Sequence, residues 1–225
     1  MKTIGFLSFA LLATPIVGCS TDTGRDLGPA QRSEPITSAA GGAADITTED
    51  AKDFIHHVAI VNLAEIDLGR LALDHGAAAE VRKFAQMMID DHTASADTLK
   101  TLALDLKVDV PGEIDAKHVE QRDKLTKRFG ADFDRAYASA MIDGHKDLLE
   151  QLEPRIDKKG LDQWKVEMNG KTKARGSVAV LPDKSDNRTT MRINQFAASI
   201  YPTVHAHLEA AKALESSLEK RQTKR

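Results

Sequence analysis

The chain has 225 residues, of which 41% are hydrophobic and 29% are charged, enough apolar material for one core of ordinary size. This composition excludes a chain that is disordered throughout and a protein with several membrane spans. Because 31 basic side chains are balanced by 34 acidic ones, and aromatic residues make up only 4% of the chain, we expect no nucleic-acid partner. The single cysteine excludes an internal disulfide.

The first 19 residues have the pattern of a bacterial lipoprotein signal peptide. Lys2 precedes an apolar run over residues 4–13, which is too short to span a bilayer as a retained helix. The Ile-Val-Gly-Cys sequence that ends at Cys19 resembles a lipobox, in which the cysteine becomes the first mature residue and carries acyl chains. We therefore expect export and membrane anchoring through lipidated Cys19 on the periplasmic side. Since Ser20 follows rather than aspartate, we expect the outer membrane if the cell has one.

Residues 20–46 are rich in Gly, Ser, Thr, Pro and Ala and show no helix or strand periodicity, which predicts a flexible tether. From Thr47 onward alanine, leucine and charged residues dominate, so we expect an all-α domain over residues 47–220 and a basic tail at 221–225. The predicted helices span residues 48–75, 78–106, 116–128 and 131–152, and a last one begins near Arg192 or at Pro202 and ends near 220.

Residues 158–191 are predicted to form an inserted loop before the last helix. This segment contains the only tryptophan, Trp164, an excess of lysine and arginine, and a candidate short strand at Val178, Val180 and Leu181. It could dock an unidentified partner protein. We favour the interpretation that the segment is a solvent-exposed loop with no binding role, because long loops commonly tolerate such charge.

Each long helix carries one ionisable side chain in the middle of its predicted apolar face. Steps of alternately three and four residues place Glu65, His92, His145 and His207 among aliphatic neighbours. An unpaired carboxylate is costly in such surroundings, so we expect an imidazole, water or a cation near Glu65. One carboxylate and three imidazoles could together bind one transition-metal ion, with Zn, Fe, Mn and Cu all acceptable.

The same four side chains could instead form a Glu–His hydrogen-bond network around trapped water, and we rank this network ahead of the metal site. As a third possibility, the four side chains could lie too far apart to meet at one site. Around the ligands of such a metal site we expect Asp91, Tyr137, Met88 and Met141. Asp91 could orient His92, although a solvent-facing role is favoured, and core packing is the commoner role of a buried methionine.

Several stretches resemble, in order and spacing, the bacterial envelope family called domain of unknown function 4142. The resemblance covers roughly residues 50–218 and brings no reaction with it. It implies export and a ferritin-like four-helix bundle, in which we place a short extra helix between helices two and three. The stretches are residues 84–92 (FAQMMIDDH), Ala64-Glu65-Ile66 with Gly69, Phe133-Asp134 with Tyr137 and His145, and Pro202 with His207, Leu208 and Ala211.

Two features of the sequence limit the chemistry that we expect. Ile89 and Val204 stand three residues before His92 and His207, where a ferritin-type di-iron site needs glutamate, so any metal site is expected to be mononuclear. No phosphate-binding loop, nucleophile elbow or paired-acid arrangement is present, which disfavours an enzyme.

The favoured function is a lipid-anchored binding or envelope-stress module, with or without metal. The alternatives are a metal-dependent oxidoreductase and a scaffold that docks a partner through the inserted loop.

Overall fold

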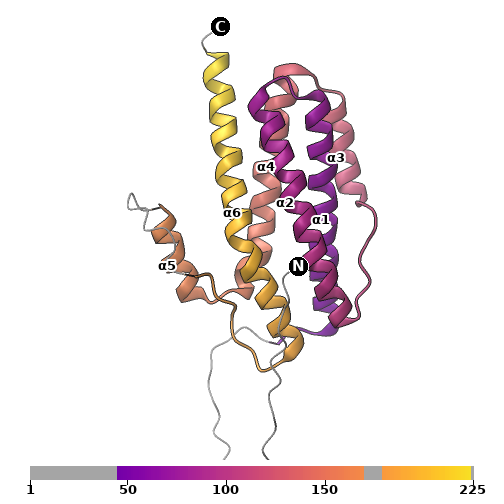
Figure 1. The fold of residues 1–225 in the computed structure, drawn as a ribbon, viewed down its shortest axis with the longest axis vertical. Helices are drawn as coiled ribbons and strands as arrows, with labels where there is room; N and C mark the ends of the chain where they lie inside the picture. The colour runs from indigo at the N-terminus through magenta and orange to yellow at the C-terminus, as the bar shows by residue number, and fades with distance from the viewer. Residues whose placement is uncertain (1–44, 170–178, 224–225) are drawn as a thin grey trace, which may run out of the picture. The chain divides into compact units, whose positions relative to one another are not determined.

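The structure is a computed structural model that describes residues 45–169 and 179–223. The predicted signal peptide, Cys19 and nearly all of the predicted tether lie outside these residues. The described part forms six α-helices, joined by loops and by one short 3-10 turn (Glu153–Arg155), which confirms the predicted all-α class (Figure 1). The helices are α1 (Thr48–His75), α2 (Ala79–Leu106), α3 (Ala116–Thr126), α4 (Gly130–Leu152), α5 (Lys158–Asn169) and α6 (Arg188–Gln222).

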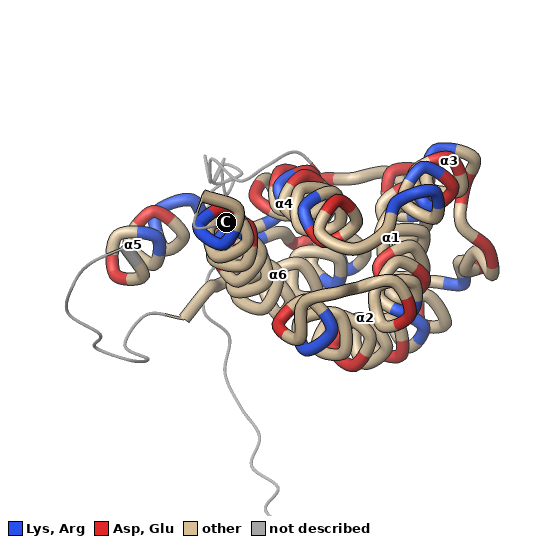
Figure 2. Tube along the Cα trace, turned by 90° about the horizontal axis from the view of Figure 1, so that it is seen from above, with Lys and Arg blue, Asp and Glu red and all other residues tan. Residues whose placement is uncertain are grey.

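Helices α1, α2, α4 and α6 form the bundle, and their apolar faces make its core. α1 packs on α2 and α4 on α6, while contacts of α2 with α6 and of α1 with α4 close the arrangement (Figure 1). Side chains that are fully buried between these helices include Ile55, Val58, Leu99, Leu148 and Ile193. Lysine, arginine, aspartate and glutamate positions are mixed along the helices (Figure 2). None of the described helices combines the length and hydropathy needed to cross a bilayer.

The start of α2 is capped by a residue of another helix. The residue that precedes α2, Ala78, has no side chain that could accept a hydrogen bond from the first turn. The buried carboxylate of Asp134 on α4 instead binds the two amides that lead into the helix: Oδ1 accepts from the amide of Ala77 and Oδ2 from that of Ala78, each at 2.9 Å. This contact fixes the position of α2 along the bundle axis relative to α4. It therefore also determines which residues farther along the two helices lie at the same height in the bundle.

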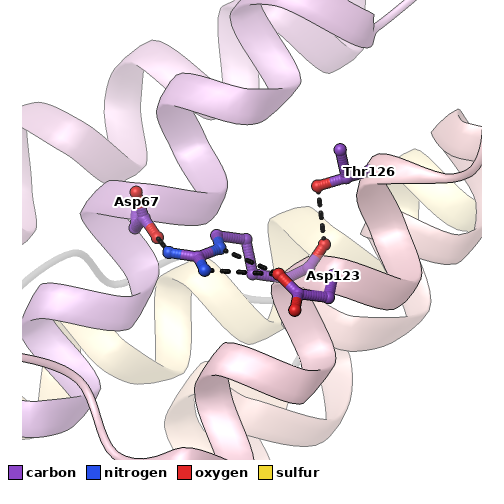
Figure 3. A network of polar contacts seen from close by, with 4 residues as sticks. Asp67, Asp123 and Thr126 are labelled. Carbon is purple, nitrogen blue, oxygen red and sulfur yellow. Dashed lines mark hydrogen bonds and ion pairs between the residues drawn. The ribbon is translucent and has the colours of Figure 1, made fainter.

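The short helix α3 lies against α1 and is linked to it by Arg122 (Figure 3). The guanidinium of Arg122 contacts Asp67 of α1 at 3.3 Å and its own neighbour Asp123 at 3.2 Å, and the hydroxyl of Thr126 donates to the carbonyl of Arg122 at 2.9 Å. These ion pairs are partly exposed, so we assign them a modest share of the stability. The predicted extra helix between the second and third long helices is confirmed.

The prediction of a loop over residues 158–191 is wrong at both ends. Residues 158–169 form α5, whose Leu161 and Trp164 are buried, with the Trp164 ring edge-on to Tyr201 of α6 at 5.6 Å. Lys165 and the Tyr201 hydroxyl both bind Glu153, at 2.6 and 2.9 Å. Burial of the indole explains why this charged segment is helical. The candidate strand near Val180 is replaced, within the described residues, by a single bridge between Ile156 and Pro182.

The last helix begins earlier than predicted, at Arg188. Asn187 precedes it and accepts a hydrogen bond from the amide of Thr190 at 3.0 Å, a strong N-terminal signal. Pro202 therefore lies inside α6, fourteen residues after its start, and is not a first-turn proline. The long helix carries His207 to the level of the other three predicted site residues.

Candidate metal centre

The four ionisable residues predicted to lie on the apolar faces are all buried. Their exposed fractions are 4% for Glu65, 3% for His92, 1% for His145 and 3% for His207. They come from α1, α2, α4 and α6, one from each helix of the bundle. The helical period thus identified one buried ionisable residue in each of the four bundle helices.

The three imidazoles form a compact cluster. Their ring centroids are 5.6 Å apart for His92 and His145, 5.5 Å for His92 and His207, and 5.3 Å for His145 and His207. One nitrogen of each ring lies within 4.8 Å of the corresponding nitrogens of the other two. Side chains separated by more than fifty residues along the chain are therefore close enough to share one ion.

One nitrogen of each ring is bound to an acceptor outside the cluster. Nδ1 of His92 lies 2.9 Å from the side-chain oxygen of Asn62, and Nδ1 of His145 lies 2.8 Å from the backbone carbonyl of Met141. Nε2 of His207 lies 2.8 Å from a carboxylate oxygen of Asp91. Because a carbonyl or carboxylate oxygen only accepts, each of these ring nitrogens must carry the proton.

The other nitrogen of each ring is buried without a hydrogen-bond partner among the described residues: Nε2 of His92, Nε2 of His145 and Nδ1 of His207. In a neutral imidazole whose first nitrogen is protonated, the second is a lone-pair acceptor. Three acceptors cannot satisfy one another. These imidazoles therefore cannot complete a hydrogen-bond network by themselves. The Glu–His network ranked first from the sequence needs its trapped water as the donor, and the metal site needs a cation.

Burial favours the neutral form of two of these imidazoles, those of His92 and His145. Burial, reinforced by the neighbouring rings of His145 and His207, holds the pKa of His92 well below its usual value. Burial also lowers the pKa of His145 to about 4, against the opposing effect of its bond to the Met141 carbonyl. Neutral imidazole is the form that binds metals, so these two rings need not lose a proton at pH 7 before they bind an ion.

Glu65 lies beside the cluster rather than within it. Its Oε1 is 3.8 Å from Nδ1 of His145, the nitrogen that is already bound to Met141, and its carboxylate is not among the grouped ligand atoms. Burial raises the pKa of Glu65 to about 8, so the carboxyl group is largely protonated at neutral pH. The geometry therefore gives three candidate nitrogen ligands and places Glu65, the predicted fourth ligand, next to one of them.

A glycine and a tyrosine adjoin the Glu65 carboxyl group. A Cβ atom at Gly144 would lie only 2.9 Å from Oε1 of Glu65, so the missing side chain makes room for the acid. The hydroxyl of Tyr137 is buried without a hydrogen-bond partner in the described part of the chain, as is Oε2 of Glu65. Burial, and secondarily the charge of Glu65, raises the pKa of Tyr137 well above its usual value, so the phenol stays protonated.

Of the remaining predicted supporting residues, Asp91 binds a histidine other than the one considered, and the two methionines have the core-packing role that the sequence favoured. Asp91 binds His207 on α6 and not His92, its neighbour in the sequence. Met141 contributes its backbone carbonyl to His145, and both its side chain and that of Met88 are fully buried in the core. Sequence reasoning missed Asn62, although a buried polar residue one helical turn before Glu65 was a signal of the same kind.

The dimensions of the cluster suit one ion after a small contraction. Zinc–imidazole bonds of about 2.0–2.1 Å place tetrahedral nitrogen ligands roughly 3.3 Å apart. One nitrogen of each ring lies within 4.8 Å of the other two, so binding one ion requires these nitrogens to approach each other by up to about 1.5 Å. An all-nitrogen set suits Zn, Cu or Fe better than Mn, which prefers oxygen ligands.

Comparison with known families places most of these elements in a recognised domain. Residues 36–174 match the model of a family described as a domain of unknown function, DUF4142. The match includes α1 to α5, and thus Glu65, His92 and His145, but ends before α6 and His207, short of the extent of about residue 218 that the sequence suggested. No curated protein and no solved structure matches the chain.

Proposed function

The chain belongs to the DUF4142 family, and because that family model brings no reaction with it, we propose from the site itself that the bundle binds one transition-metal ion. His92, His145 and His207 are the ligands. The observation that carries the proposal is the set of three buried ring nitrogens that have no hydrogen-bond partner among the described residues, each on a ring whose other nitrogen is bound to an acceptor. Histidine ligands of metals are commonly held by an outer acceptor of this kind.

The direct test is metal analysis of protein purified without chelators, followed by titration of metal-free protein with Co²⁺. We expect one equivalent of bound metal and a visible absorption band from cobalt bound by nitrogen ligands. His92→Ala and His145→Ala should each remove both signals. His57→Ala is the matched control, since it removes an exposed histidine of α1 and should leave the stoichiometry unchanged. Wild-type protein that binds no Co²⁺, Zn²⁺ or Cu²⁺ would refute the proposal.

A metal-dependent oxidoreductase is the second candidate. Three protein ligands leave at least one coordination position for an exogenous molecule, an arrangement that catalytic metal sites share. Turnover of peroxide by the metal-loaded protein, lost in His145→Ala, would support this activity. A loaded protein that binds metal but turns over no peroxide would leave binding as the function.

We also propose that the bundle is tethered to a membrane as a periplasmic lipoprotein. Support for this proposal comes from the sequence that ends at Cys19 and from the Gly- and Ser-rich segment over residues 20–46. Residues 1–44 lie outside the described part of the chain. The test is fractionation of cells that express the full chain: Cys19→Ser should move the protein from the membrane to the soluble fraction, and a variant that stays in the membrane would contradict the proposal.

A further inference from the structure

A cavity of about 270 Å³ connects solvent with the level of the histidine cluster, between α2 and α6. His92 and His207 both line it, together with the buried residues Asn62 and Leu148. At its outer edge lie exposed residues of both helices, including Thr98 and, on α6, Ser199 and Thr203. The cavity therefore runs from the surface to two of the three proposed ligands.

The lining of this cavity is chemically selective. Its polar side chains at the outer edge are the hydroxyls of Ser95, Thr98, Ser199 and Thr203 and the carboxylate of Asp91, and neither lysine nor arginine is among the lining residues. A lining rich in oxygen atoms that includes no basic side chain suits a hydrated cation and disfavours an anion. This composition distinguishes the cavity from a binding site for phosphate or a carboxylate.

Asp91 connects the two ends of this path. One of its oxygens, Oδ2, lies 2.8 Å from Nε2 of the buried His207, yet 44% of the Asp91 side chain is exposed. Asp90, the preceding residue, carries the same charge but binds Gln86 at 2.8 Å and does not line the cavity. One carboxylate therefore faces both the solvent and a proposed ligand, and its neighbour does not.

We propose that this cavity is the entry path for a divalent cation and that Asp91 captures the cation at its mouth and passes it to His207. The inference rests on the proposed function, because it assumes the ion site at the three histidines. It makes the bound metal exchangeable with solvent, as in a carrier or buffer, without unfolding of the bundle. Attraction to an anionic group at a cleft entrance typically raises association rates tenfold or more at low salt.

Stopped-flow mixing of metal-free full-length protein with Co²⁺ tests the path, with dissociation followed after addition of a chelator. Asp91→Asn keeps an oxygen that can accept from His207 but removes the charge, so association should slow about tenfold and lose most of its salt dependence. Were Asp91 only to orient His207, dissociation would accelerate and association would stay the same. Asp90→Asn is the matched control and should bind cobalt at the wild-type rate.

A second variant probes the path without touching the histidines or their acceptors. Thr203→Arg places a cation and a long side chain at the mouth, on the exposed surface of α6. Association and dissociation should both slow by a similar factor, which leaves the dissociation constant close to that of wild type. Wild-type rates in Thr203→Arg, with faster dissociation alone in Asp91→Asn, would overturn the entry path while cobalt binding survives. If wild-type protein takes up no cobalt, the proposed function itself fails and the path fails with it.

Discussion

Asn62 on α1 fixes the ring of His92 on α2: its side-chain oxygen accepts from Nδ1 at 2.9 Å, while its amide nitrogen donates to the hydroxyl of Ser95 at 3.3 Å. The second contact orients the amide so that oxygen, and not nitrogen, faces the imidazole. The proton of His92 is thereby held on Nδ1, and Nε2 remains a lone-pair donor for an ion.

Asn62→Leu should weaken metal binding without disrupting the bundle. Leucine has nearly the same size, but it leaves the Nδ1 proton of His92 unpaired and the ring free to change tautomer. Loss of such an outer partner typically costs 10–100-fold in metal affinity. Cobalt titration monitored by absorbance measures the effect, with circular dichroism as the check on folding. Ser95→Ala, which removes only the longer contact, should have a smaller effect, and an unchanged affinity in Asn62→Leu would contradict this role.

Metal should raise the melting temperature of the protein. A ligand that binds only the folded state stabilises it by about 2.7 kcal/mol at a free concentration one hundred times its dissociation constant. For a domain of this size such a gain corresponds to a rise of roughly 5–10 °C. Differential scanning calorimetry with and without Zn²⁺ measures the shift. The rise in melting temperature should vanish in His92→Ala and persist in His57→Ala. A similar rise in both variants would show that the ion binds elsewhere.

The stability of the metal-free protein should depend on pH in opposite directions on the two sides of neutrality. His145 has its pKa lowered by burial from 6.5 to about 4, so its stabilising effect is present above pH 6.5 and is lost as the pH falls through 4. Glu65 has its pKa raised by burial from 4.5 to about 8, so its effect is present below pH 4.5 and is lost as the pH rises through 8.

Because His92 has a lowered pKa as well, the histidines outweigh Glu65 between pH 4.5 and 6.5, and only Glu65 acts between 6.5 and 8. We expect the free energy of unfolding to be highest near pH 6.5. Urea denaturation at a series of pH values measures this profile. Glu65→Gln should flatten the decline above pH 6.5, and an unchanged decline in that variant would show that another group is responsible.

The helical period predicted which residues face inward, but it could not predict which of them meet. Glu65, His92, His145 and His207 were identified because an ionisable residue interrupts an apolar row in each helix, and burial of all four follows from that row. The contact between Asp91 and His207 depends on the rotation of α2 relative to α6, which no periodicity within one helix contains. Likewise, the rotation of α1 relative to α4 determines that Glu65 faces Nδ1 of His145 and not the cluster nitrogens.

The helix at residues 158–169 escaped prediction for a related reason. Among residues 158–168, whose burial the structure describes, only Leu161 and Trp164 are buried, too few apolar residues to produce a recognisable periodic face. The helix is stabilised by contacts with residues outside it, chiefly those of Trp164 with Tyr201 and of Lys165 with Glu153. Tertiary contacts, rather than local propensity, determine its structure.

His145→Leu should abolish metal binding and at the same time raise the stability of the metal-free protein. Within the described residues the ring donates its hydrogen bond to the carbonyl of Met141, which also belongs to the backbone ladder of α4, so removing the imidazole leaves that carbonyl paired. Leucine also removes the unpartnered Nε2, whose burial costs about 1–3 kcal/mol. Metal-free His145→Leu is therefore expected to unfold at higher urea concentration than wild type while losing all stabilisation by Zn²⁺. Lower stability in the absence of metal would indicate that the imidazole contributes to folding in its own right.

Gly144 and Glu65 should show strong energetic coupling. Alanine in the interior of a helix is normally about 1 kcal/mol more favourable than glycine. At position 144, however, the added Cβ would lie 2.9 Å from Oε1 of Glu65, so Gly144→Ala must displace a buried carboxyl group or the helix that carries it. We expect Gly144→Ala to destabilise the wild-type protein by roughly 1–3 kcal/mol, the usual cost of overpacking a core.

The sign of this effect should reverse when Glu65 is shortened. In a Glu65→Ala background the space beside residue 144 is free, and Gly144→Ala should stabilise the protein by up to about 1 kcal/mol. Urea denaturation of the two single variants, the double variant and the wild type gives the coupling energy. A coupling of more than roughly 1 kcal/mol is expected for residues in direct contact. If the effects of the two substitutions on the free energy of unfolding are additive, the carboxyl group of Glu65 is not held against α4. The glycine at position 144 would then be required by a contact other than that with Glu65.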